Sequence, residues 1–225
     1  MTWEYTSRPN NIDELALYPN LRKKLELYFS KKDYSHILMY GLPGTGKTTA
    51  ARILGDKIGS PIEIDCSESN DKKTMLDIAK NTSSVSIFGT RRCVILDEFD
   101  DVDKKSQKVF KKVLEDSWKR NTFIFCVNSL DAVTEPIQSR CMCLPFNIGV
   151  LNEKTLKLEL HNYHNMNRDE WVEELKRVAR IVASKNKVSV SEEQLNRVSA
   201  SDENIVDVRR FIRNVEDEVE MDNFT

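Results

Sequence analysis

The chain has 225 residues, of which 40% are apolar and 31% charged, and its formal net charge is -2. This length suits a main domain with a smaller companion, and it is enough to bury a substantial core. The composition excludes an intrinsically disordered chain, and the small net charge excludes a globally basic nucleic-acid-binding protein, so any DNA contact has to come from a local patch.

The N-terminal stretch "MTWEYTSRPNNIDEL" lacks the basic start and the apolar run of a signal peptide, and no apolar run is long enough to span a bilayer. We therefore expect a soluble, intracellular protein without membrane contact. The cysteine count is odd and the spacings include no second ligand pair for zinc, so we expect reduced, mostly buried thiols and no structural metal. The five cysteines are Cys66, Cys93, Cys126, Cys141 and Cys143.

Apolar runs bounded by breakers recur along the first two thirds of the chain: "HILMYG", "PIEIDC", "RRCVILDEFD", "NTFIFCVN" and "CMCLPF". The segments between them have helical spacing, which predicts a five-stranded parallel sheet with crossover helices. One such helix is expected from about Lys104 to Trp118, with Val109, Val113 and Leu114 on its inner face and its lysines outward. After Phe146 the strand-like runs stop, the segment 147–167 has no clear pattern, and from about Arg168 the pattern is helical.

The stretch "GLPGTGKT" from Gly41 to Thr48 follows the first apolar run and precedes a helical pattern. It matches G-x-x-x-x-G-K-[ST], the phosphate loop, in which glycines let backbone N–H groups converge on phosphate oxygens. Lys47 is then expected to reach the outer phosphates and Thr48 to ligate Mg²⁺, with Gly44, Thr45, Gly46 and Thr49 completing the site. The alternative is a glycine-rich turn that happens to precede a helix.

In the run "CVILDEFD" four apolar residues lead into two adjacent carboxylates. This pair helps to distinguish among kinases, GTPases and ATPases, which all have a phosphate loop. Asp97, at the strand end, can hold magnesium through water, and Glu98 can polarise a water for in-line attack on the γ-phosphate. The alternative is a buried strand that runs into a solvated acidic turn. A third run ends in Asn128, whose amide can hydrogen-bond the γ-phosphate and the attacking water, or can simply begin a turn.

Four stretches in this order, "GLPGTGKTT", "VILDEFD", "CVNSLDAVTEPIQSRC" and "DVRRFIRNVE", resemble the AAA+ ATPases. The likeness is to the small subunits of sliding-clamp loaders of the eukaryotic, archaeal and T4-like phage kind, and the Ser-Arg-Cys triplet at 139–141 is its most specific part. The resemblance implies an AAA+ core over 1–148, a helical lid over 149–225, bound ATP and Mg²⁺, and ATP hydrolysis.

Carried over by position, the resemblance makes Asp97 the metal carboxylate, Glu98 the catalytic base and Asn128 the first sensor. It implies that Arg209 is the second sensor on the lid and that Arg8 and Pro9 lie next to the adenine. Arg140 is implied to reach into the neighbouring subunit's site, where a planar guanidinium suits the charge on the transferring phosphoryl group.

Two features depart from the resemblance. Relatives typically carry an asparagine where this chain has Asp65; a carboxylate there would repel Glu98, so either the restraint on the glutamate is altered or Asp65 is protonated. The expected third, collar domain is absent after Thr225, which indicates either a truncated chain or a short member, of viral or phage origin, that assembles in another way.

The expected partners are other loader subunits in a pentamer or another oligomer, a sliding clamp and primer-template DNA. Lys72 and Lys73, at the start of a helix, can meet DNA phosphates, and a solvated lysine pair explains them equally well. Ile87 and Phe88 are candidates for clamp contact or for core.

The leading function is an ATPase subunit of a DNA-replication clamp loader, in the cytoplasm of a bacterial host or archaeon, or in a nucleus. A helicase loader or repair ATPase is one alternative, which the Ser-Arg-Cys triplet disfavours. A nucleotide-binding assembly subunit without hydrolysis is the other, which Glu98 and Asn128 disfavour.

Overall fold

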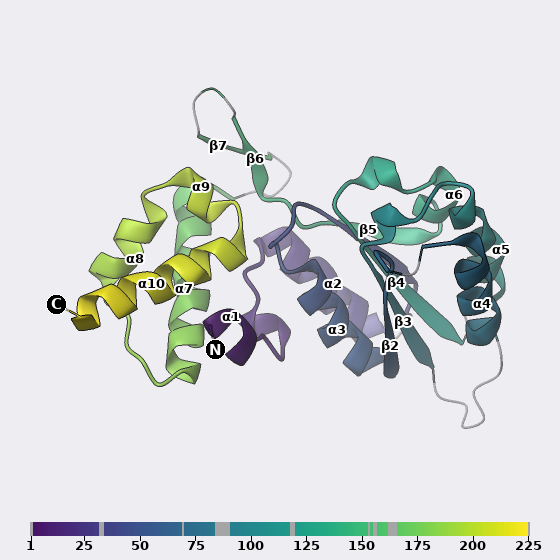
Figure 1. The fold of residues 1–225 in the computed structure, drawn as a ribbon, viewed down its shortest axis with the longest axis horizontal. Helices are drawn as coiled ribbons and strands as arrows, with labels where there is room; N and C mark the ends of the chain where they lie inside the picture. Colours follow the sequence, from purple (N-terminus) through teal and green to yellow (C-terminus); the bar gives the residue numbers. More distant parts are fainter. Residues whose placement is uncertain are drawn as a thin grey trace. The chain divides into compact units, whose positions relative to one another are not determined.

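The computed structural model describes residues 2–31, 34–68, 70–83, 91–117, 120–152, 154, 157–161 and 166–224. The chain divides into two compact units. Residues 25–41 and 47–146 form the sheet unit, and residues 1–24, 42–46 and 147–225 form the helical unit. The proposed boundary after residue 148 stays a prediction, and each unit is described by itself below (Figure 1).

The sheet unit is built on five parallel strands in the order β2-β3-β4-β1-β5. The strands are β1 (His36–Tyr40), β2 (Ser60–Asp65), β3 (Arg92–Asp97), β4 (Asn121–Val127) and β5 (Cys141–Pro145). The central strands are almost continuously apolar, as expected of parallel strands covered on both faces. This confirms the predicted five-stranded parallel sheet. Because β3, β4 and β1 are neighbours, their carboxyl ends meet at one edge.

Helices cover both faces of this sheet (Figure 1). α3 (Lys47–Ile58) packs on one face, where Gly55 lies against Cys93 and Ile95. α4 (Lys72–Ser83) and α5 (Phe110–Ser117) cover the other. The core there contains four phenylalanines in edge-to-face or stacked contact, with ring centroids 4.8 Å apart for Phe99 and Phe125. Phe99, directly after the acidic strand end, is fully buried and anchors that turn.

The predicted helix from Lys104 differs in detail. The chain first makes a 3₁₀ turn, η3 (Ser106–Val109), and α5 begins only at Phe110. Buried Gln107 explains the tight turn, because its side chain donates to the carbonyls of Val102 and Ala132 and accepts from Thr134 N. Phe110 and Leu114 are the buried positions, while the five lysines, Lys104, Lys105, Lys108, Lys111 and Lys112, are exposed as expected.

Two short strands lie in the segment 147–167, to which the sequence pattern assigns no element. β6 (Gly149–Leu151) and β7 (Leu158–Leu160) form a two-stranded antiparallel sheet in the helical unit. Three-residue strands are too short to display an alternating pattern, which is why the sequence does not reveal them. Shorter elements elsewhere are η2 (Phe99–Asp101), η4 (Leu130–Ala132) and α6 (Glu135–Gln138).

The C-terminal region is helical, as predicted: α7 (Arg168–Lys185), α8 (Glu192–Ser199), α9 (Asp202–Ile205) and α10 (Val208–Phe224). α7 and α8 each begin with a capping box, formed by Asn167 with Glu170 and by Ser191 with Gln194. The buried Trp171 ring donates its Nε1 hydrogen to the Ile205 carbonyl at 2.7 Å, which ties α7 to α9.

The N-terminal segment belongs to the helical unit. α1 (Trp3–Thr6) is held where Trp3 N donates to both carboxylate oxygens of Glu216 on α10, each at 3.1 Å. A second anchor follows η1 (Ile12–Glu14), at the start of α2 (Pro19–Lys31).

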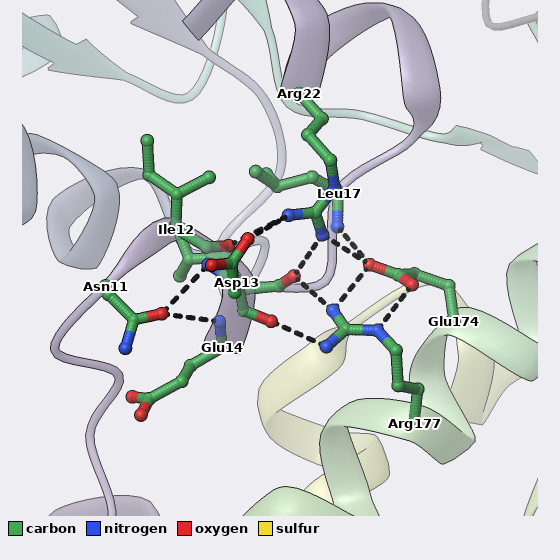
Figure 2. Close-up of polar contacts among 9 residues, drawn as sticks. Asn11, Ile12, Asp13, Glu14, Leu17, Arg22, Glu174 and Arg177 are labelled. Atoms are coloured by element: carbon green, nitrogen blue, oxygen red, sulfur yellow. Dashed lines mark hydrogen bonds and ion pairs between the residues drawn. The ribbon is translucent and has the colours of Figure 1, made fainter. Parts of the chain in front are cut away.

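Figure 2 shows this second anchor, in which Arg22 and Arg177 converge on Glu174. Arg22 Nη2 lies 2.9 Å from Glu174 Oε1, and Arg177 Nε lies 2.8 Å from Oε2. The same arginines donate to the Leu15 carbonyl, at 3.2 and 3.0 Å, and Leu17 N donates to Glu174 at 3.2 Å. We call Arg22, Glu174 and Arg177 the Glu174 network.

No helix in the described part of the chain is long and apolar enough to cross a membrane. All five cysteines are free thiols; Cys66, Cys93 and Cys126 are buried and the other two are half-buried, in agreement with the sequence.

Candidate nucleotide-binding site

The phosphate-loop motif has the backbone that an anion cradle needs. Gly44 and Gly46 adopt φ values of 76° and 91°, in the left-handed region that only glycine adopts without strain. A Cβ added at Gly44 would also lie 2.0 Å from the Asp207 carboxylate. Thr45 Oγ1 donates to the Leu42 carbonyl at 2.8 Å and closes the turn. Glycine is therefore required at these positions.

Lys47 and Thr48, the first residues of α3, lie at the carboxyl edge of the sheet. The Lys47 side chain is buried, and its Nζ donates to the Gly41 carbonyl at 2.6 Å and to Asn128 Oδ1 at 3.3 Å. Thr48 Oγ1 donates to both Asp97 oxygens, at 3.1 and 2.8 Å. A hydroxyl beside a carboxylate is the oxygen-donor set that Mg²⁺ takes, so these residues fit the ion. Thr49 follows, half-buried.

Glu98 is exposed, and its backbone has φ 51° and ψ 39°, a left-handed conformation that is uncommon for a residue with a side chain. The fully buried Phe99 ring next to it holds this turn in place. Partial burial, followed by the charges of four carboxylates with Asp65 foremost, raises the pKa of Glu98. A carboxylate with a raised pKa is better suited to accept a proton from water.

The contacts of Asp65 bear on its two alternatives, a charged group that repels Glu98 or a protonated one. It accepts hydrogen bonds from Ser67 Oγ and Ser67 N, at 2.6 and 2.9 Å, and these bonds lower the pKa of Asp65. The Ser67 donors therefore favour the charged form of Asp65. The charged form repels Glu98, as the raised pKa of Glu98 indicates.

Asn128, directly after β4, lies beside the lysine and the acidic turn. Its Oδ1 accepts from Lys47 and its Nδ2 donates to Asp100 Oδ2 at 2.9 Å. The sequence motifs alone do not single out Asp100. Its signal was present in the acidic run "DEFD", but such a run does not say which carboxylate faces Asn128.

Arg140 is half-buried at the end of α6. Its Nε donates to Glu115 Oε1 at 3.0 Å, its Nη2 also reaches that oxygen, and its Nη1 donates to the Pro136 carbonyl at 2.7 Å and to Ser139 Oγ at 3.3 Å. The hydrogen bond from Arg140, followed by its charge, lowers the pKa of Glu115. Within this chain, therefore, the guanidinium is held by Glu115 of α5 and by Pro136 and Ser139.

Three further predicted site residues, Arg8, Pro9 and Arg209, belong to the helical unit, as does loop segment 42–46. Arg209 is exposed in the first turn of α10, and its backbone N donates to the Gly44 carbonyl at 3.3 Å. Arg8 is exposed and Pro9 half-buried in the N-terminal segment.

Comparison with known proteins agrees with this arrangement. Residues 37–146 match the family described as ATPase family associated with various cellular activities (AAA). Over this span, about half of the chain, the sequence is similar to an AAA ATPase domain. That span begins in β1 and ends just after β5, so the matched region contains the five-stranded sheet except for His36.

Similar proteins include Replication factor C small subunit 2 of Pyrobaculum islandicum, 28% identical over 64% of this chain and 48% of that protein. The Replication factor C small subunit of Thermofilum pendens is 31% identical over 64% of this chain and 47% of that protein. The chain thus spans about half the length of the relatives it matches. The Thermotoga maritima RuvB Holliday junction branch migration motor has the same fold, with a TM-score of 0.67 at 18% identity over 96% of this chain and 73% of that one.

Outside the AAA site, the predicted DNA contacts lie at the start of α4. Lys72 and Lys73 are exposed. The Asp71 carboxylate accepts from Lys73 N at 2.8 Å and from Thr74 N at 3.1 Å, so the helix amides are already capped and only the lysine side chains face outward. Ile87 and Phe88 lie outside the described residues. No group of three or more metal-ligating side chains occurs among the residues that are described.

Proposed function

We propose that this chain is an ATPase subunit of a sliding-clamp loader, which couples ATP binding and hydrolysis to the opening of a clamp and its loading onto primer-template DNA. The observation that carries this proposal is the meeting of Lys47, Thr48, Asp97, Glu98 and Asn128 at one edge of the sheet. The similarity to replication factor C small subunits and the Ser139-Arg140-Cys141 triplet support the loader role over a general ATPase.

In this proposal each residue of the sheet unit has one task. Lys47 and the loop amides bind the outer phosphates, and Thr48 and Asp97 hold Mg²⁺, which supplies charge neutralisation when bound. Glu98 takes a proton from the attacking water while the bond from the γ-phosphorus to the bridging oxygen breaks. ADP, phosphate and one proton are the products. Asn128 orients the water.

Arg140 completes the site of a neighbouring subunit, where a guanidinium supplied in trans stabilises the transferring phosphoryl group. The resemblance suggests that Arg209 contacts phosphate from the lid and that Arg8 and Pro9 flank the adenine. Because Glu115 holds Arg140 within the subunit, assembly has to exchange that ion pair for the neighbour's phosphate.

The DNA partner is proposed to contact the exposed Lys72 and Lys73 through backbone phosphates, without base readout. Such a loader works with other subunits, as a pentamer or another oligomer, and with a sliding clamp. It is a soluble protein located where DNA is replicated, in the cytoplasm of a bacterial host or archaeon or in a nucleus.

The test is ATP hydrolysis by the purified chain, with its co-purifying subunits, in the presence of primer-template DNA and the clamp encoded by the same genome. We expect hydrolysis that DNA and clamp together stimulate, and none from Lys47→Ala. Hydrolysis that neither component changes would favour another AAA ATPase task, such as helicase loading or repair. ATP binding without turnover would favour a non-hydrolysing assembly subunit.

A further inference from the structure

One buried polar atom stands apart among the residues that the structure describes. Asp100 Oδ1 is the only buried side-chain oxygen or nitrogen there that lacks a hydrogen-bond partner. A buried carboxylate oxygen without a donor is unfavourable for folding, so Asp100 is a poor choice for stability alone. Its other oxygen, Oδ2, accepts from Asn128 Nδ2 at 2.9 Å.

The two contacts of the Asn128 amide fix which way it points. Lys47 can only donate, and it lies 3.3 Å from Asn128 Oδ1. The Asp100 carboxylate can only accept when ionised, and it faces Nδ2. A reversed amide would place its NH₂ group against the ammonium and its carbonyl oxygen against the carboxylate. Both contacts would then be repulsive.

The Asn128 side chain needs such a constraint because it is exposed at the end of β4. The last torsion of an asparagine is broad, and packing does not restrict it at an exposed position. Asp100, by contrast, lies in η2, where the fully buried ring of Phe99 anchors the backbone. The anchored residue therefore determines the orientation of the exposed one.

We propose that Asp100 is a positioning residue that acts through Asn128, holding the amide with its carbonyl oxygen toward Lys47 at the phosphate end of the site. In this orientation Asn128 accepts a hydrogen bond from the attacking water or from Lys47, and the amide hydrogen that Asp100 leaves unused remains for a phosphate oxygen. The inference rests on the proposed ATPase function.

The kinetic test compares Asp100→Ala, Asn128→Ala and the double variant, with Asp101→Ala as a matched control. Asp101 is exposed in the same turn, and its charge, like that of Asp100, helps raise the pKa of Glu98. We expect Asp100→Ala to lower kcat roughly three- to tenfold, the effect of about one hydrogen bond, while the KM for ATP changes less than about twofold. Asp101→Ala should have a smaller effect.

The double variant identifies the route of the effect. If Asp100 acts through Asn128, removing both side chains should be no worse than removing Asn128 alone. Asp100→Asn should retain most of the activity, because its Oδ1 can still accept from Asn128. Losses that multiply in the double variant, or an equal loss in Asp101→Ala, would overturn the proposal.

A second measurement does not depend on turnover. In a ¹⁵N spectrum of the asparagine-labelled protein, the Asn128 side-chain signals are those that disappear in Asn128→Ala. We expect the Nδ2 proton that Asp100 accepts to be shifted downfield in the wild type and to move toward the shift of a solvated amide in Asp100→Ala, with no such change in Asp101→Ala. Unchanged Asn128 signals in Asp100→Ala would refute the positioning role even if the wild type hydrolyses no ATP, whereas a missing ATPase activity alone would count only against the proposed function.

Discussion

Carboxylates have opposite surroundings in the two units. We compare the strand-end cluster of the sheet unit, which is Asp65, Asp97 and Glu98, with the Glu174 network of the helical unit. In the first, three carboxylates, Asp65, Asp97 and Glu98, lie close together near solvent, and their repulsion contributes to the raised pKa of Glu98. In the second, two guanidinium groups surround one carboxylate (Figure 2). Burial alone would raise the pKa of Glu174, but the bonds from Arg177 and Leu17 N and the two positive charges outweigh it and lower that pKa.

If the chain is the ATPase proposed above, this difference separates residues that serve catalysis from residues that serve folding. A cluster of like charges opposes folding and leaves a proton acceptor in reach of water, whereas a balanced and hydrogen-bonded network stabilises the fold and has no free acceptor. Substitutions in the strand-end cluster and at Arg140 should therefore change turnover with little loss of stability. Substitutions in the Glu174 network should do the reverse.

The largest effect is expected at Arg140. If its guanidinium completes a neighbour's site, Arg140→Ala should bind ATP normally and hydrolyse it about a thousandfold more slowly. Arg140→Lys should also be slow, since a single ammonium lacks the planar fork. Steady-state hydrolysis and calorimetric ATP binding measure the two quantities.

Mixing Arg140→Ala with Lys47→Ala subunits provides the control. An interface that pairs an intact Lys47 pocket with an intact Arg140 forms only in the mixture, so some activity should return. If native mass spectrometry shows mixed oligomers that stay inactive, Arg140 does not act in trans.

Glu98→Gln should come next. The amide keeps the shape of the side chain but cannot take a proton, so hydrolysis should fall about a hundredfold or more while ATP binding remains. Thermal stability should stay equal or rise, because one negative charge leaves a repelling cluster. A large loss of stability would place Glu98 with the structural residues and break the comparison.

The sequence revealed most of the candidate nucleotide-binding site because its residues lie in short motifs next to strand ends, and parallel strands bring those ends to one edge. Lys47 with Thr48, and Asp97 with Glu98, are each adjacent in the chain. The parallel sheet was likewise readable from long apolar runs. The short strands β6 and β7 were not readable, because three residues show no period.

The Glu174 network was out of reach for another reason. Arg22 and Glu174 are 152 residues apart. Much of the remaining bonding goes to the backbone carbonyls of Ile12, Asp13 and Leu15, and a backbone carbonyl carries no sequence signal because every residue has one. Asp100 was missed because an acidic run does not specify which member faces an amide. Long-range pairing of this kind depends on tertiary packing.

A test of the helical unit is Glu174→Ala, which leaves Arg22 and Arg177 without their shared carboxylate. The Glu174 side chain is 15% exposed, so we expect a loss of about 1–3 kcal/mol in the free energy of unfolding. Urea or thermal unfolding measures it. The Glu174 contribution should be full above the ordinary carboxyl pKa and should disappear as the pH falls through the lowered folded-state value.

The matched control is Asp169→Ala on the same helix, whose side chain is 95% exposed. Its loss should cost less than about 1 kcal/mol, mainly through the helix dipole. Glu174→Ala and Asp169→Ala should both hydrolyse ATP normally at temperatures where they are folded. Equal stability of the two variants would show that the network contributes nothing to folding.

The smallest expected effect is at Asp65, and it measures the repulsion directly. Asp65→Asn keeps an acceptor for Ser67 N but removes the charge that helps raise the pKa of Glu98. The pKa of Glu98 should therefore fall toward its ordinary value, and the acidic limb of the kcat/KM profile should move to lower pH. Because both carboxylates lie near solvent, the displacement should be small and should shrink in high salt. Asp131→Asn, which removes an exposed charge from η4, should leave the profile in place. An acidic limb that Asp65→Asn does not move would mean that partial burial and the other three carboxylates set the pKa of Glu98, and that the acid at position 65 has no part in tuning the base.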